Sequence, residues 1–194
     1  MITEVLENHI YTSSHPLQLL DEVVVRSARQ ADVQGIVDII AEHARRHQLL
    51  PRSAESIRSS IDTWVVAEAE GQVVGCGSLL QMSPTLVEVR SLAVLPAYRR
   101  YGVGRDIVML LVEHARQQGI PIVFALTRAV LFFERIGFSV TSKEHFPEKV
   151  WNDCAICPLQ MYCDETAVML EVDRWGEHKS ALLPTDSFTG EKFR

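Results

Sequence analysis

The sequence lacks three features that would each place it in a particular class of protein. No apolar run among its 194 residues approaches the roughly 18 residues that a membrane-spanning helix needs. Basic residues are not in excess, since 25 acidic and 19 basic side chains give a net charge of −6, which argues against a general nucleic-acid-binding surface. Residues 1–16 carry acidic side chains and no apolar segment, so they do not resemble a secretory signal. We therefore expect a cytoplasmic protein that binds neither nucleic acid nor membrane.

Cysteine is also scarce, with four residues in the chain. In the absence of an export signal, this number is typical of reduced cytosolic thiols. Cys154, Cys157 and Cys163 have C-x₂-C-x₅-C spacing, and the first pair has the spacing of metal ligands. A closed zinc site needs a fourth ligand, for which His145 or Asp164 is a candidate. We expect structural thiols and no metal, and keep metal binding as the weaker alternative.

The composition is that of an ordinary globular protein. Hydrophobic residues make up 47% of the chain and charged residues 23%, which excludes wholesale disorder. We assign residues 1–22 to an N-terminal extension, 23–172 to one folded domain and 173–194 to a polar C-terminal tail.

Hydrophobic patterns divide the folded domain into strands and helices. Runs of β-branched and apolar residues predict strands, and apolar residues at helical spacing predict helices. The expected strands cover residues 23–29, 63–69, 73–80, 86–94, 122–126 and 165–172. The expected helices cover a segment capped by Asp32 that reaches Ala44, a short one from Ser53 to about Ile61, and residues 102–118 and 130–138. This order predicts an α/β (α+β) fold with a mixed central sheet and helices on both faces.

The most informative segment joins the strand that ends near Val94 to the helix that begins at Gly102. It reads Arg99-Arg100-Tyr101-Gly102-Val103-Gly104. Glycines let the backbone approach a bulky anion, the helix N-terminus offers unpaired N–H groups, and the arginines add full charges. The bland alternative is an ordinary helix start with a solvated basic turn. Because a strand precedes the loop and a helix follows it, we favour a pyrophosphate-binding loop.

These motifs resemble those of the GNAT superfamily of acyl-CoA-dependent N-acetyltransferases. Residues 99–104 are similar to its [QR]xxGx[GA] loop, Val94-Leu95-Pro96 to its strand end, and residues 131–138 to its late helix. The resemblance implies a GNAT fold, a V-shaped opening between two strands, and acetyl-CoA as cosubstrate. The cofactor-binding residues that it implies are Leu92, Ala93, Val94, Arg99, Arg100, Tyr101, Gly102, Val103, Gly104, Arg105, Phe132 and Phe133.

A closer resemblance is to the acetyltransferase domain of N-acetylglutamate synthases, particularly the short stand-alone form. Residues 49–53, 87–94, 125–128 and 146–165 carry it. It implies direct transfer of acetyl, in a ternary complex, to the α-amine of L-glutamate, the first step of arginine biosynthesis. Two departures stand against the pattern. Phe133 occupies the position where many GNAT enzymes have a tyrosine as general acid. The acidic pair Asp164-Glu165 stands where the longer synthases have basic residues.

The residues for binding and activating such an acceptor are also predicted. A dicarboxylate needs cationic anchors, for which Arg52 and Arg128 are the first candidates and Arg90 the third, the alternative for each being an idle surface charge. Glu88 is the candidate base for the amine, because strand alternation is expected to place it on one face with Arg90 and Leu92.

Alternatives stay open for several of these roles. Glu88 is otherwise an exposed partner of Arg90, and Thr127 is the candidate general acid unless the CoA thiolate leaves unassisted. The acceptor is otherwise a polyamine, an antibiotic or a protein terminus, and a non-catalytic acyl-CoA- or metal-sensing module is a further alternative. A homodimer is also compatible with the sequence. We expect Cys76 in the core, and His43 and His47 on a solvated helix face beside two arginines.

Overall fold

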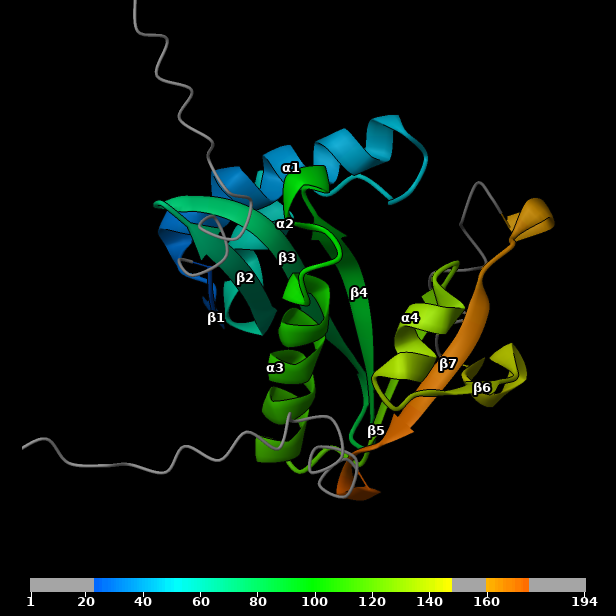
Figure 1. Ribbon diagram of the computed structural model, residues 1–194. Helices are drawn as coiled ribbons and strands as arrows, with labels where there is room; N and C mark the ends of the chain where they lie inside the picture. The colour runs from blue at the N-terminus through cyan, green and yellow to red at the C-terminus, as the bar shows by residue number, and fades with distance from the viewer. Residues whose placement is uncertain (1–22, 148–159, 175–194) are drawn as a thin grey trace, which may run out of the picture.

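The structure is a computed structural model that describes residues 23–147 and 160–174 (Figure 1). Within these ranges, seven strands form one mixed sheet in the order β1-β2-β3-β4-β5-β7-β6. The strands are β1 (Val24–Ser27), β2 (Trp64–Ala69), β3 (Gln72–Ser83), β4 (Leu86–Val94), β5 (Ile122–Thr127), β6 (Ser139–Thr141) and β7 (Thr166–Glu171). The α-helices are α1 (Val33–Arg45), α2 (Ala54–Ser59), α3 (Val103–Gln117) and α4 (Val130–Arg135). In the described part of the chain, no helix is long and apolar enough to cross a membrane.

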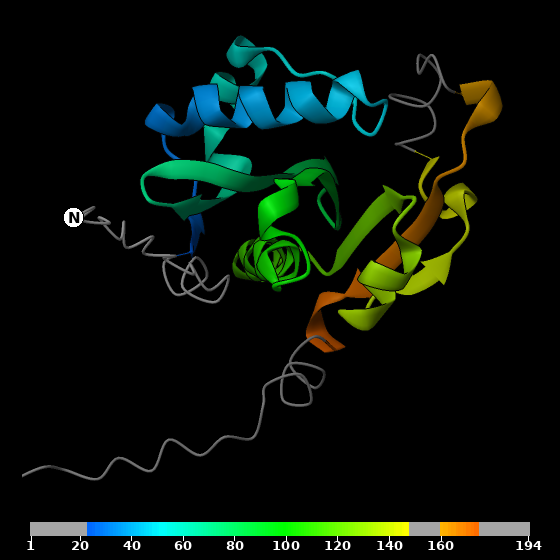
Figure 2. The ribbon, with the colours of Figure 1, turned by 45° about the horizontal axis from the view of Figure 1, so that its top comes forward.

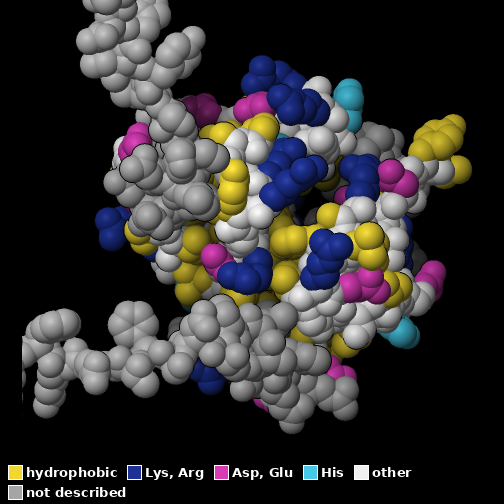
Figure 3. All heavy atoms as spheres, viewed as in Figure 1, with side chains coloured by type: hydrophobic (Ala, Val, Ile, Leu, Met, Phe, Trp, Pro, Cys, Tyr) yellow, Lys and Arg dark blue, Asp and Glu magenta, His cyan; other side chains and the backbone are white. Residues whose placement is uncertain are grey.

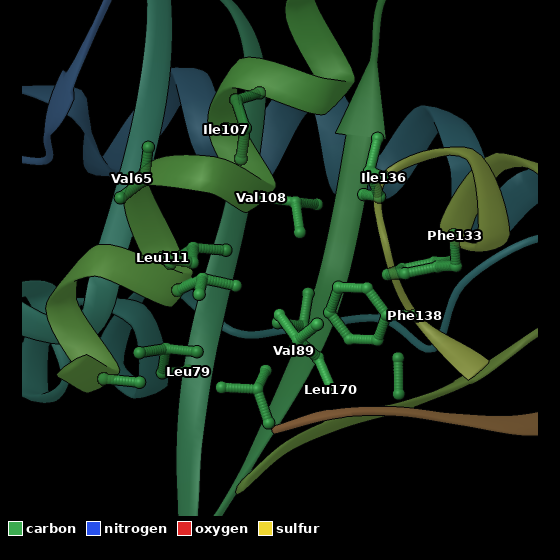
Figure 4. Close-up of a cluster of buried hydrophobic side chains, with 14 of the residues drawn as sticks. Val65, Leu79, Val89, Ile107, Val108, Leu111, Phe133, Ile136, Phe138 and Leu170 are labelled. Carbon is green, nitrogen blue, oxygen red and sulfur yellow. The ribbon is translucent and has the colours of Figure 1, made fainter. Parts of the chain in front are cut away.

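Helices cover both faces of the sheet, as predicted. Figure 2 shows α1 on one side of β2, β3 and β4 and α3 on the other. The core under α3 is one cluster that includes Ile107 and Leu111 of α3, Val89 of β4, and Phe133 and Phe138 (Figure 4). The core under α1 and α2 is a separate cluster of buried residues. Both cores remove apolar side chains from water, which is the main driving force for this fold.

The predicted strands and helices are present, and two details differ. The pattern analysis missed β6, whose three residues are too few to produce a hydrophobic period. Asp32 precedes α1 but does not cap it, because its carboxylate accepts hydrogen bonds from the Arg26 guanidinium at 2.7 and 2.9 Å and from the Arg29 amide at 2.7 Å. Ser53 does cap α2, since its hydroxyl accepts from the Ser56 amide at 3.1 Å.

Helix α3 lies unusually near the backbone of β3. A methyl group added to Gly75 would lie 3.0 Å from Ile107, and one added to Gly77 would lie 3.0 Å from Ile107 and 3.1 Å from Leu111. The two glycines therefore provide the space that the helix side chains occupy.

A bulge interrupts the alternation of β4. Ser91 has a φ of 56°, and β4 has one residue more than β3 between two successive pairs, Cys76–Ala93 and Ser78–Arg90. A β-bulge of this kind reverses the side-chain alternation of the strand that carries it.

The bulge corrects one prediction about β4. Val89 and Leu92 both pack in the core under α3, although three positions separate them. Glu88 and Arg90 precede the bulge and alternate with Val89, so they belong to the opposite face. The expectation that Leu92 shares a face with Glu88 is therefore wrong, because simple alternation fails at Ser91.

The sheet opens between β4 and β5. The parallel ladder of these strands has three pairs, Leu86–Ile122, Val87–Val123 and Glu88–Phe124. Beyond Glu88 the two strands separate. On its other edge, β5 pairs along its whole length with β7. This separation creates the V-shaped opening that the resemblance implies.

Candidate active site

A cleft of about 850 Å³ lies where β4 and β5 separate. Residues 89–94 of β4 form one wall and residues 125–129, at the end of β5, form the other. The N-terminus of α3 and helix α4 close two more sides. Figure 3 shows a hollow with basic side chains on its rim. The volume is that of a site for a small molecule or cofactor, and the charge favours an anionic one.

The predicted phosphate loop forms a backbone concavity at one end of the cleft. Arg100 has a φ of 70° and Gly102 a φ of 88°, and Gly102 directly precedes α3. Successive amides in such left-handed turns form an anion-binding nest, and the first N–H groups of α3 have no acceptor within the helix. The helix dipole adds partial positive charge at the same place. The loop therefore has the geometry and the electrostatics that a diphosphate requires.

The side chains of the twelve predicted cofactor residues are divided between the cleft and its surroundings. Val103 is buried in the core and Tyr101 is exposed, so neither side chain lines the cleft. The residues that line the cleft, the two glycines through their backbone, are Leu92, Ala93, Val94, Arg99, Arg100, Gly102, Gly104, Arg105, Phe132 and Phe133.

Two aromatic side chains of α4 form part of the cleft wall. The rings of Phe132 and Phe133 meet edge to face with centroids 5.1 Å apart, and Phe133 meets Phe138 in the same way. A methyl group added to Gly104 would lie 3.6 Å from the Phe132 ring. Phe132 therefore lies directly against the first turn of α3, and the apolar wall of the cleft is continuous with the phosphate loop.

His43 lies in the cleft wall, which corrects its predicted place on a solvated surface. Its side chain is buried at 6% exposure, whereas His47 is exposed as expected. The ring Nδ1 lies 2.9 Å from the Ile39 carbonyl oxygen and Nε2 lies 2.9 Å from Nη2 of Arg99. The sequence did contain the signal, because His43 follows Ile36 and Ile40 at helical spacing and so continues the buried stripe of α1.

The three arginines predicted to bind the acceptor lie in different positions. Arg90 and Arg128 line the cleft, whereas Arg52 does not. Arg128 donates from Nε to Asp164 at 2.6 Å and from Nη1 to the carbonyl of His47 at 3.4 Å. The hydrogen bond from the Arg128 guanidinium holds the pKa of the Asp164 carboxyl below its ordinary value. One candidate anchor therefore already has a carboxylate partner.

The two predicted catalytic residues lie on either side of the point where the strands separate. Glu88 is 3% exposed, occupies the last pair of the β4–β5 ladder and does not itself line the cleft, whose lining on β4 begins at the next residue, Val89. Thr127 lines the cleft, and its hydroxyl oxygen accepts from the Ala129 amide at 2.9 Å. That bond leaves the hydroxyl proton of Thr127 available to a further acceptor.

The cysteines contribute no chemistry to the cleft within the described residues. Cys76 is fully buried as predicted, and burial raises the pKa of its thiol to about 12. Cys163 is exposed and accepts from Lys143 Nζ at 3.2 Å. Cys154 and Cys157 lie outside the described residues, and residues 23–147 and 160–174 contain no cluster of His, Cys, Asp or Glu suited to a metal ion.

Comparison with known proteins matches residues 34–138 to the acetyltransferase (GNAT) family. The chain belongs to this family. An uncharacterized N-acetyltransferase of Chlorobaculum tepidum is 41% identical over 152 residues, which are 76% of this chain and 96% of that protein. The amino-acid acetyltransferase of Mycobacterium tuberculosis is 37% identical over 60% of this chain and 68% of its own length. The predicted GNAT fold, family and acyltransferase class are thereby confirmed.

A solved structure of an N-acetylglutamate synthase gives a closer view of such a GNAT domain. The protein from Neisseria gonorrhoeae, complexed with coenzyme A and N-acetyl-glutamate, superposes with a TM-score of 0.69 at 26% identity. The match covers 77% of this chain and 35% of that one. The likeness therefore concerns one part of the larger synthase.

Proposed function

We propose that this GNAT protein transfers the acetyl group of acetyl-CoA to the α-amine of L-glutamate. The observation that carries the proposal is that the Gly102 loop and two arginines, Arg90 and Arg128, line the same cleft. The similarity to amino-acid acetyltransferases, and to a synthase crystallised with CoA and N-acetyl-glutamate, supports the acceptor. The product would place the reaction at the start of arginine biosynthesis, in the cytoplasm.

The donor side of the proposal depends on backbone and charge. The amides around Gly102 and the first turn of α3 would hold the diphosphate of acetyl-CoA, and Arg99 and Arg100 would add positive charge. Arg105 would contribute less, because its guanidinium is paired with Asp106 at 3.0 Å. The separated edge of β4 between Val89 and Val94 offers backbone groups to the amide-bearing arm of the cofactor. Acetyl-CoA supplies an acetyl group that its thioester activates.

The acceptor side depends on side chains that come from different segments. Arg128 and Arg90 would pair with the two carboxylates of glutamate, because a guanidinium binds a carboxylate through two parallel hydrogen bonds. Arg128 would exchange Asp164 for the substrate carboxylate. Arg128 meets Asp164 through Nε alone and at an exposed position, so we expect the exchange to cost little.

Two residues would move protons during the transfer. Glu88 would take a proton from the glutamate ammonium, directly or through a water molecule, so that the amine can attack. Thr127 would pass its hydroxyl proton to the departing sulfur and regain one from the nitrogen of the tetrahedral intermediate, which must lose a second proton to become an amide. The amine attacks the acetyl carbon directly, so an N–C bond forms, the C–S bond breaks, and no covalent link to the protein is needed.

The experiment is a turnover assay of acetyl-CoA with each of the twenty amino acids, read as release of free thiol. We expect L-glutamate to give the highest kcat/KM, and intersecting rather than parallel double-reciprocal plots, as a ternary complex requires. Polyamines, an aminoglycoside and a peptide amine are included for comparison. Turnover only with a cationic amine would contradict glutamate as acceptor, and absence of turnover with every amine would contradict the enzyme class.

A further inference from the structure

The contact between His43 and Arg99 joins α1 to the phosphate loop. Nδ1 of His43 lies 2.9 Å from the Ile39 carbonyl oxygen. A carbonyl accepts and never donates, so Nδ1 carries the ring proton and Nε2 has a free lone pair. The guanidinium of Arg99 donates to that lone pair from 2.9 Å. The geometry therefore fixes one neutral tautomer of a buried imidazole.

Arg99 is held at a second point by the end of β4. Its Nε donates to the Val94 carbonyl at 2.9 Å, and its own backbone follows the short 3₁₀ turn Pro96–Tyr98. The guanidinium is thus fixed between β4 and α1, one residue before the left-handed turn at Arg100. Both His43 and Arg99 line the cleft.

The chemical nature of the group that bonds Arg99 determines how much of the positive charge of its guanidinium remains available to an anion. Several other arginines of the described chain are paired with carboxylates, as Arg26 is with Asp32 and Arg116 with Glu113. A carboxylate orients a guanidinium but cancels its charge. A neutral imidazole orients the group equally well and leaves the full positive charge available to an anion.

We infer that His43 is a positioning residue that holds the Arg99 guanidinium at the donor site without neutralising its charge. The inference rests on the proposed function, because it assigns Arg99 to the phosphate groups of acetyl-CoA. It also connects the two sides of the cleft. The carbonyl of His47, two residues beyond the end of α1, accepts a hydrogen bond from Arg128. The last turn of α1 and the residues that follow it therefore contact both Arg99 and Arg128.

The test measures the affinity of the purified full chain for CoA by isothermal titration calorimetry. His43→Leu removes the acceptor at similar size and is expected to raise the Kd by about three- to tenfold, the effect of one hydrogen bond of ordinary strength. The KM for acetyl-CoA is expected to rise by a similar factor, whereas kcat is expected to fall by a smaller one. His43→Gln, whose amide oxygen can accept in place of Nε2, restores most of the affinity. His114→Leu is the control, because His114 does not line the cleft.

A double-mutant cycle separates positioning from general support of the fold. Arg99→Ala alone is expected to weaken CoA binding, and adding His43→Leu to Arg99→Ala is expected to have no further effect. An equal loss from His43→Leu in both backgrounds would overturn the inference. So would a His43→Gln variant that binds CoA as weakly as His43→Leu.

The tautomer can be examined in the wild-type protein, independently of whether any variant folds. Two-bond ¹H–¹⁵N NMR at neutral pH is expected to show His43 protonated at Nδ1, and protonation at Nε2 would refute the proposed contact. Failure of the wild-type protein to bind CoA would instead contradict the proposed function itself. The two failures are therefore distinguishable.

Discussion

The proposed donor and acceptor sides of the cleft are built in different ways. The anion-binding part of the donor side comes from one continuous segment, residues 91–105, in which left-handed turns and a helix start bring backbone amides together. The acceptor side joins side chains from separate parts of the chain, including Arg90 in β4, Arg128 after β5 and Asp164 before β7. Backbone geometry thus defines the site for the common cofactor, and side-chain pairing defines the site for the variable acceptor.

The largest expected effect is a loss of kcat on substitution of Glu88, which lies at the last β4–β5 pair next to the cleft. Glu88→Gln keeps the shape and removes the base, so kcat is expected to fall by about 10² to 10⁴, the usual contribution of general base catalysis. The affinity for CoA is expected to stay nearly constant, which calorimetry would measure. A parallel loss of turnover and CoA affinity would assign Glu88 to the structure of the cleft instead.

The next effect should be confined to the acceptor side. Arg128→Ala is expected to raise the KM for glutamate by about ten- to thirtyfold, since it removes a charged hydrogen-bonding partner at a partly exposed position. The KM for acetyl-CoA should change far less. Arg116→Ala is a matched control, because Arg116 is also exposed and bonds Glu113 at 2.6 Å outside the cleft. Unchanged glutamate kinetics in Arg128→Ala would remove Arg128 from the acceptor site.

A smaller effect should be confined to the donor side. Gly71 and Gly102 have φ values of 77° and 88°, and a methyl group fits at both without a close contact. Alanine at either position should therefore cost a similar 1–2 kcal/mol, roughly, in unfolding free energy. Only Gly102→Ala is expected to raise the Kd for CoA, by about three- to tenfold, because part of that strain moves the loop amides. Equal CoA affinity in the two variants would contradict the nest.

The smallest expected effect has the opposite sign. Asp164→Asn weakens the partner that competes with the substrate for Arg128, so the KM for glutamate should fall by about two- to fivefold, as expected for one exposed ion pair. Steady-state kinetics at varied glutamate would measure it. A rise in KM would show that Asp164 orients Arg128 for the substrate. Glu113→Gln, the corresponding change on α3, serves as control.

The difference between local backbone geometry and long-range side-chain pairing also explains which features of the protein could be predicted from its sequence. The strands, the helices and the loop around Gly102 follow from local patterns, because propensity and periodicity act over a few residues. The phase of Leu92 was wrong, since a bulge leaves no periodic signal. The ion pair of Arg128 with Asp164 spans 36 residues of sequence and depends on the folded β5–β7 pair. Burial of His43 was recognisable from the α1 stripe, but its charged neighbours Arg45 and Arg46 suggested the opposite.

The two glycines of β3 give the sheet control over the donor site from a distance. Gly75 and Gly77 leave no space between the strand and α3, so a methyl group at either position would act as a spacer beneath that helix. The turn at Gly102 directly precedes α3, so a shift of the helix would also move the loop amides. Alanine at Gly75 or Gly77 would therefore be expected to change the affinity for the cofactor, although neither residue lines the cleft.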